Sequence, residues 1–286
     1  MDFQLTDDQR ALRSGVRELL EGRFGRDALR AAVDSPGHLD RDLWRELGEA
    51  GFFSLRLPES HGGVGLGLAE AVLAFEEAGR VLLPGPLVAT HLAAGDVPGA
   101  ATGEAVVTAV TGTLVPWLDA SDVVRGDVRE AEPITSTDPL TPLHRVPQGP
   151  PPSPHGVLLA AAEQLGSAAR TTEMAVQHAR ERTQFGQPIG AFQAVKQLCA
   201  QMLVRAEVAR AAVYAAAVTA DSLEIAGAKL LADEAAVRNA RDCLQVHGGM
   251  GFTWEADVHL HLKRAWLRAE LGPSAGESEE ALAAAL

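Results

Sequence analysis

The stretch that decides the fold is Arg180-Glu-Arg-Thr-Gln-Phe-Gly-Gln-Pro-Ile-Gly-Ala-Phe-Gln193. Its glycines and its proline predict that one helix ends here and another begins, because neither residue type readily continues a helix. The arginines could clamp a phosphate, and the glutamines could contact an adenine or a ribose. Alternatively, Arg180 and Arg182 complement the negative end of a helix that Gly186 caps. Taken alone, the stretch favours this second interpretation.

Apolar residues at helical spacing follow this stretch. They recur at alternating intervals of three and four positions: Phe192, Val195, Cys199, Met202, Ala206, Ala209 and Val213. This spacing predicts a buried stripe suited to packing in a helical bundle. The chain from Val157 to the mid-240s is expected to be close to continuous helix.

A second, glycine-rich segment follows the long helical region: Gln245-Val-His-Gly-Gly-Met-Gly-Phe-Thr-Trp-Glu255. One glycine would suffice to cap a helix, but three glycines stand within four positions. Adjacent glycines let a ligand approach bare main chain. No strand is expected before them, and their spacing is not a dinucleotide-binding fingerprint. His247 by itself is more often structural than catalytic.

The rest of the chain predicts three parts. Residues 1–98 are expected to be helical, with a capping box at Thr6 and Gln9 and a loop entered from the buried aromatic pair at 52–53. Residues 99–153 predict a small, irregular β region with β-prone pieces at 105–110, 122–125 and 143–146, followed by a proline-rich linker. Residues 154–286 form the C-terminal helical part, whose acidic tail beyond Ser274 frays or docks as a short helix.

The composition excludes several classes of protein. A formal net charge of -13 argues against a nucleic-acid partner, because binding phosphates generally needs a basic surface. Cys199 and Cys243 both lie in apolar helical contexts and nothing resembles a secretory signal, which indicates free thiols in the reducing cytoplasm. No apolar run reaches the ~18 residues needed to span a bilayer. We predict neither a membrane segment nor a metal site.

The order, spacing and surroundings of the two motifs closely resemble the C-terminal domain of acyl-CoA dehydrogenases. The opening Met-Asp-Phe-Gln-Leu-Thr and the segment from Gly51 to Leu66 resemble the N-terminal helical domain of that family. The resemblance covers nearly the whole chain except residues 99–154. It implies a mainly α fold with an N-terminal helical domain, a truncated β middle region and a C-terminal four-helix bundle.

In that family the FAD site is shared between subunits, one holding the flavin ring and its neighbour the ADP end. The positions that match the ADP-holding residues are Arg182, Gln184, Phe185, Gln193, Gln245, Gly248 and Gly249. The resemblance implies that Arg182 neutralises the pyrophosphate, that Phe185 packs on the nucleotide and that the glycines let main chain approach it. FAD is therefore the expected cofactor and an acyl-CoA the expected substrate.

The catalytic glutamate that the family needs is missing at both positions that can supply it. The reaction requires a desolvated carboxylate with a raised pKa to remove the α-proton while hydride passes to the flavin. An ungapped comparison places Gly272 at one of these positions and Gly156 at the other. Glu270 and Glu163 are the available substitutes, but we expect both to be ordinary solvated helix carboxylates. The middle region also lacks a Thr-Glu-Pro-x-Ala-Gly-Ser-like stretch that would hold the flavin ring.

A chain that keeps the ADP-holding residues but lacks the catalytic glutamate would be of little use alone. We therefore predict a subunit that completes the FAD site of a full-length homologous partner in an α2β2 heterotetramer. Heteromers of this kind resemble those with which actinobacteria oxidise CoA thioesters of steroid side chains, and the segment from Gly251 to Arg264 resembles that subset. The resemblance also allows an electron acceptor of the electron-transfer flavoprotein type. Two alternatives stay open: a self-sufficient homomeric dehydrogenase with a relocated base, and a non-enzymatic helical scaffold.

Overall fold

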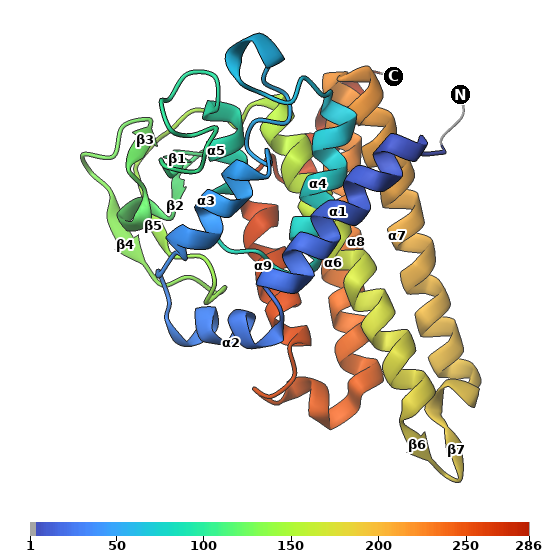
Figure 1. Ribbon diagram of the computed structural model, residues 1–286. Helices are drawn as coiled ribbons and strands as arrows, with labels where there is room; N and C mark the ends of the chain where they lie inside the picture. The colour runs from blue at the N-terminus through green and yellow to red at the C-terminus, as the bar shows by residue number, and fades with distance from the viewer. Residues whose placement is uncertain (1–3, 286) are drawn as a thin grey trace.

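The computed structural model describes residues 4–285, and Figure 1 shows its long helices packed side by side, with the short strands of the middle region gathered at one flank. The helices of the N-terminal part are α1 (Asp7–Arg23), α2 (Arg26–Asp34), α3 (Arg41–Glu49), α4 (Leu68–Arg80) and α5 (Leu87–Ala93). The predicted capping box begins α1: the Thr6 N–H donates to Gln9 Oε1 (3.0 Å), and the Gln9 N–H donates to Thr6 Oγ1 (3.2 Å). The sequence predicted that this part is helical but gave no separate bounds for α2 or α5.

Four aromatic side chains fix the loop that joins α3 to α4. Trp44 contacts Phe53 with ring centroids 4.6 Å apart, and Phe52 contacts Phe75 at 5.1 Å. All four are buried, which confirms the predicted aromatic entry into this loop.

The middle region contains only short strands, as the sequence predicted. They are β1 (Val107–Ala109), β2 (Leu114–Pro116), β3 (Val123–Arg125), β4 (Glu132–Ile134) and β5 (Leu143–Arg145). Strands β1 and β3 pair in parallel, while β5 lies between β2 and β4 in an antiparallel sheet. The three predicted pieces correspond to β1, β3 and β5.

The C-terminal part is a bundle of long helices. It comprises α6 (Pro154–Glu181), α7 (Gln193–Thr219), α8 (Ser222–His247), α9 (Val258–Glu270) and α10 (Ala275–Ala284), with the short hairpin β6 (Thr183–Gln184) and β7 (Gln187–Pro188) between α6 and α7. Helix α6 begins where the proline-rich linker ends, and the hydroxyl of Ser153 caps it by accepting from the Gly156 N–H (3.1 Å). Within residues 4–285, no helix combines the length and apolarity that crossing a membrane requires.

The predicted apolar stripe of α7 is only partly buried. Met202, Ala206, Ala209 and Val213 lie in the core, whereas Phe192, Val195 and Cys199 are not fully buried. The prediction was wrong for these three because the first turns of α7 lie at the end of the bundle beside the β6–β7 hairpin (Figure 1).

Two glycines bring α4 and α6 into close contact. A Cβ at Gly79 would lie 2.0 Å from the carbonyl oxygen of Glu163, and one at Gly166 would lie 1.9 Å from that of Glu76. Any larger residue would force the helices apart. This contact places the middle of α6, including Glu163, in the interior.

Candidate functional site

The two sequence motifs lie at the same end of the bundle (Figure 1). The first forms the β6–β7 hairpin, whose turn places Phe185 (φ 53°) and Gly186 (φ 78°) in the left-handed region. The second follows the end of α8 at His247. The imidazole of His178, on α6, stacks on that of His247 with ring centroids 4.2 Å apart and an interplanar angle of 19°. This stack joins the helix that precedes the first motif to the start of the second.

The surroundings of His178 favour its neutral state. Burial lowers the pKa of His178, and the neighbouring His247 and Arg182 lower it further. His247 Nδ1–H donates to the Cys243 carbonyl (2.8 Å), which fixes the orientation of its ring. A neutral His178 can stack closely on the neighbouring ring, whereas two imidazolium ions would repel each other.

The residues predicted to hold the ADP end face outward. The exposed ones are Arg182, Gln184, Phe185, Gln193, Gln245 and Gly249, while Gly248 is partly buried. Within the described chain, Arg182 lies in no ion pair with a carboxylate, although its main chain accepts a hydrogen bond from Ile189 N–H (2.8 Å). An exposed guanidinium of this kind is available to an anion from outside the chain.

The two adjacent glycines have different explanations. Gly248 has φ 62° and ψ -141°, a conformation that only glycine adopts readily. Gly249 has no such conformation, and a Cβ there would meet no atom within 4 Å. Neither backbone strain nor packing within the chain requires glycine at 249. Close approach of a ligand to the main chain would require it, so the segment fits a phosphate-bearing cofactor.

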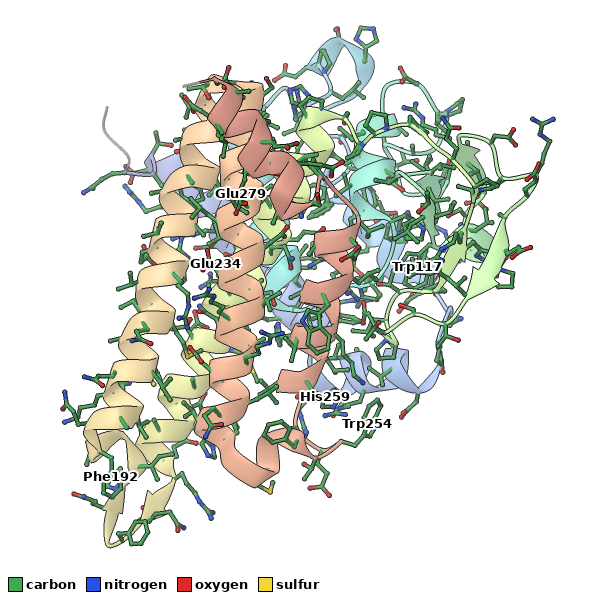
Figure 2. All side chains as sticks on the ribbon, turned by 180° about the vertical axis from the view of Figure 1, so that it is seen from behind. Trp117, Phe192, Glu234, Trp254, His259 and Glu279 are labelled. Carbon is green, nitrogen blue, oxygen red and sulfur yellow. The ribbon has the colours of Figure 1, made fainter. Side chains whose placement is uncertain are left out.

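Large apolar side chains are exposed at this end. Phe185 is 91% exposed, Phe252 74%, Trp254 55% and Met250 54%. Figure 2 shows Phe192 and Trp254 at this end of the molecule. Exposed aromatic side chains gathered around a motif indicate a surface that another molecule covers.

A cavity of about 380 Å³ forms a second candidate site, away from the two motifs. Its walls come from α5, the middle region, the proline-rich linker, α6 and the end of α9. Trp117, in the middle region, contributes one wall (Figure 2). The size and mostly apolar lining are typical of small-molecule sites.

The structure separates the two positions at which the sequence comparison found no base. Gly156 lines the cavity, but Gly272 does not, and Leu271 lines it instead. Gly272 packs against α8, where a Cβ would lie 3.1 Å from Lys229 Cε. Glu270 is exposed and faces a separate hollow between α8 and α10. Neither Gly156 nor Leu271 provides a carboxylate.

Glu163 does line this cavity, and the expectation that it is solvated was wrong. Its side chain is buried because Gly79 lets α4 pack onto α6 at this point. Oε1 accepts from Arg268 Nη2 at 2.5 Å. Burial raises the pKa of Glu163 despite the opposing effect of Arg268, and burial lowers the pKa of Arg268 to about 10. Both shifts favour neutral forms, as desolvation of a buried pair does.

A second buried pair lies beside the first. Arg264 also lines the cavity, and its Nε donates to Asp138, which is fully buried in the middle region. The sequence singled out neither residue. Each charge on α9 that faces the cavity therefore already has a carboxylate partner.

Comparison with known proteins identifies one family over most of the chain. A model described as "Acyl-CoA dehydrogenase, N-terminal domain" matches residues 6–104, and one described as "Acyl-CoA dehydrogenase, C-terminal domain" matches residues 155–280. The acyl-CoA dehydrogenase IpdE2 of Mycobacterium tuberculosis is 37% identical, over 93% of this chain and 93% of its own length. These matches confirm the resemblance drawn from the motifs.

Solved structures share the fold at lower identity. The ChsE4-ChsE5 complex from Mycobacterium tuberculosis contains a chain with a TM-score of 0.86 and 24% identity, covering 99% of this chain and 98% of that one. A variant of the Tcur3481-Tcur3483 steroid ACAD has a TM-score of 0.85 and 23% identity, with 97% of each chain covered. The mainly α fold predicted from the sequence is confirmed.

Proposed function

The chain belongs to the acyl-CoA dehydrogenase family, whose cofactor is FAD, and on that premise we propose that it completes the FAD site of a homologous partner subunit. The partner would supply the glutamate base and hold the flavin ring. The assembly would introduce an α,β double bond into an acyl-CoA thioester. When bound, FAD supplies the hydride acceptor for that reaction.

One contrast within this chain carries the proposal. The end that bears both motifs presents the expected ADP-holding residues outward, with Arg182 available and the main chain at Gly249 open. The two positions where the family resemblance implies a base are, by contrast, Gly156, which lines the cavity, and Gly272, which does not, and neither is a carboxylate. A chain with one half of a shared site is useful only when another chain provides the other half.

Each residue of the ADP-holding end has a role in this proposal. Arg182 would neutralise the pyrophosphate, and Phe185 would pack on the nucleotide. The glutamines Gln184, Gln193 and Gln245 would hydrogen-bond its polar edges.

We further propose that the assembly is an α2β2 heterotetramer acting on the CoA thioester of a steroid side chain. Support comes from two similar structures. One is the ChsE4-ChsE5 complex, and the other is a variant of the Tcur3481-Tcur3483 steroid ACAD. The short middle region, whose strands have three residues each, would also leave room for a bulky acyl group.

Co-expression with candidate homologous chains tests the proposal. We expect a stoichiometric complex that is yellow, with flavin absorbance absent from this chain purified alone. A chain that stays colourless and never associates with any homologue would refute the proposal.

A second function is favoured by the position of Glu163, which lines the cavity with a raised pKa. If Glu163 is a relocated base, this chain alone binds FAD, and an acyl-CoA bleaches its flavin. The Glu163→Gln variant would then keep its flavin and lose the bleaching, with Glu270→Gln as the matched control. Our proposal predicts instead that both variants leave the activity of the heteromeric complex unchanged.

A further inference from the structure

Two arginines of α2 hold the segment that follows the glycine-rich motif. Arg26 Nη2 donates to the Glu255 carbonyl (2.9 Å), and Arg30 Nη1 donates to the Trp254 carbonyl (2.6 Å). Both guanidinium groups also pair with the carboxylate of Asp257. Arg26 Nε donates to Oδ2 at 2.8 Å, and Arg30 Nη2 lies against Oδ1. These hydrogen bonds join residues that stand 224 to 231 positions apart in the sequence.

Helix α2 is a firm support for these contacts. Its side chains Leu29 and Val33 are buried in the hydrophobic core, which fixes the helix. Arg26 and Arg30 stand four positions apart and therefore share one face of α2. A planar guanidinium can donate to a carbonyl and to a carboxylate in a fixed geometry, whereas a lysine offers only a point charge. The helix thus presents two well-placed donor groups to the segment.

The glycine-rich motif gains from anchors at both ends. Three glycines stand within four positions, and glycine loses more conformational freedom on ordering than any other residue. At the start of the motif, the imidazole of His247 is held by its stack on His178. Beyond its end, the Trp254 carbonyl is held by Arg30. The two anchors limit the movement of the main chain between them.

We propose that Arg26 and Arg30 are positioning residues for FAD, because they hold the glycine-rich segment in the conformation that receives the ADP end. The inference rests on the proposed function, which places that end of the cofactor at Gly248 and Gly249. The arginines act through the main chain of the segment and not by contact with the cofactor. A helix of the N-terminal part thereby contributes to the cofactor affinity of the C-terminal part.

Amide hydrogen exchange of the purified full chain without FAD tests the first step. In the double variant Arg26→Ala/Arg30→Ala, exchange across residues 248–257 should accelerate about tenfold, because the segment opens locally more often. Arg41→Ala is the control. It removes the same kinds of contact elsewhere, since Arg41 pairs with Asp122 and donates to the Ala120 carbonyl (2.6 Å). The control should leave exchange in the segment unchanged, and unchanged exchange in the double variant would overturn the inference.

Titration of the apo complex with FAD tests the second step. The dissociation constant should rise about 3- to 30-fold in the double alanine variant, because binding must then order the segment. Arg26→Lys/Arg30→Lys should fall between the parent and the alanine variant, and Arg41→Ala should match the parent. A merely structural role would lower the melting temperature and leave the FAD affinity unchanged. Equal affinity in the parent and the double alanine variant would therefore refute the role of the two arginines.

Arg182→Ala separates a failure of this inference from a failure of the proposed function. If Arg182→Ala weakens FAD binding and the double alanine variant does not, the inference is wrong and the proposed function stands. If the chain forms no yellow complex with any homologue, the proposed function fails and the inference falls with it. Weakened binding in both variants, with faster exchange in residues 248–257 of the double variant alone, supports both.

Discussion

Removing the guanidinium of Arg182 should release FAD from the assembled complex without weakening the fold of this chain. Arg182 is exposed and forms no ion pair within the described chain, so Arg182→Ala breaks no internal contact of its side chain. A hydrogen bond between charged groups contributes about 1.5–3 kcal/mol. We therefore expect the dissociation constant of FAD to rise roughly 10- to 150-fold.

Arg180→Ala is the matched control, because Arg180 is also exposed and stands two residues earlier at the same helix end. The assay is titration of the apo complex with FAD, followed by flavin fluorescence. If the arginines only complement the helix C-terminus, both variants should lose about 0.3–1 kcal/mol of unfolding free energy and neither should affect FAD. Equal FAD affinity in the two variants would contradict the role that we assign to Arg182.

Three further predictions concern stability. Glu163→Leu should lower the free energy of unfolding in urea by about 3–5 kcal/mol, because it leaves Arg268 buried without its partner. The double variant Glu163→Leu/Arg268→Leu should be close to neutral. Additive losses from the two substitutions would contradict this. Phe185→Gly should stabilise the isolated chain by about 1 kcal/mol, because Phe185 has a φ of 53°, but it should weaken FAD binding by the complex. Thermal melting measures the stability and FAD titration measures the binding. A destabilised chain would contradict the prediction. His261 accepts or donates a hydrogen bond with Ser167 Oγ (2.8 Å), and burial lowers its pKa to about 3. The contribution of neutral His261 to the free energy of unfolding is therefore complete above pH 6.5 and should fall by about 2 kcal/mol at pH 5, where the unfolded chain binds a proton that the folded chain does not. Urea unfolding at pH 7 and pH 5 measures this loss, and His261→Phe should not show it.

The sequence predicted the elements whose causes are local. The capping box at Thr6 and Gln9 needs only residues three positions apart, and it forms as expected. The turn at Phe185 and Gly186 follows from the glycine and proline around it. Helix α2 was not located because it is short and its N-cap residue is Gly25, which provides no side-chain cap.

The environment of Glu163 could not be predicted, because its cause is distant in the chain. Its burial depends on Gly79, which stands 84 positions earlier in the sequence (163 minus 79) and lets α4 touch the α6 main chain. A carboxylate in an alanine-rich helix gives no sign of such a neighbour. The pairing with Arg268, 105 positions later, is equally invisible in the sequence.

The position of Gly272 shows the limit of an ungapped comparison. A difference of one residue decides whether a side chain after α9 enters the cavity or meets Lys229. The sequence contains glycine at 272 and leucine at 271, so the lack of a carboxylate holds for either alignment. That the chain lacks its own base stays a prediction, because Glu163 also lines the cavity.

Helix α6 carries parts of both candidate sites, and its length constrains how they can work together. Glu163 lines the cavity, whereas Arg182 follows the last residue of the helix. Their separation of 19 positions corresponds to about 28 Å of helical rise. A cofactor held at Arg182 would have to run along this distance to bring its reactive ring to the cavity of the same chain. A second chain lying against the exposed aromatic end could bring its own cavity to the ring directly. This geometry favours two chains for each flavin, even if Glu163 is a base. The two functional proposals therefore differ in the second chain, which is a homologous partner in the first and another copy of this chain in the second.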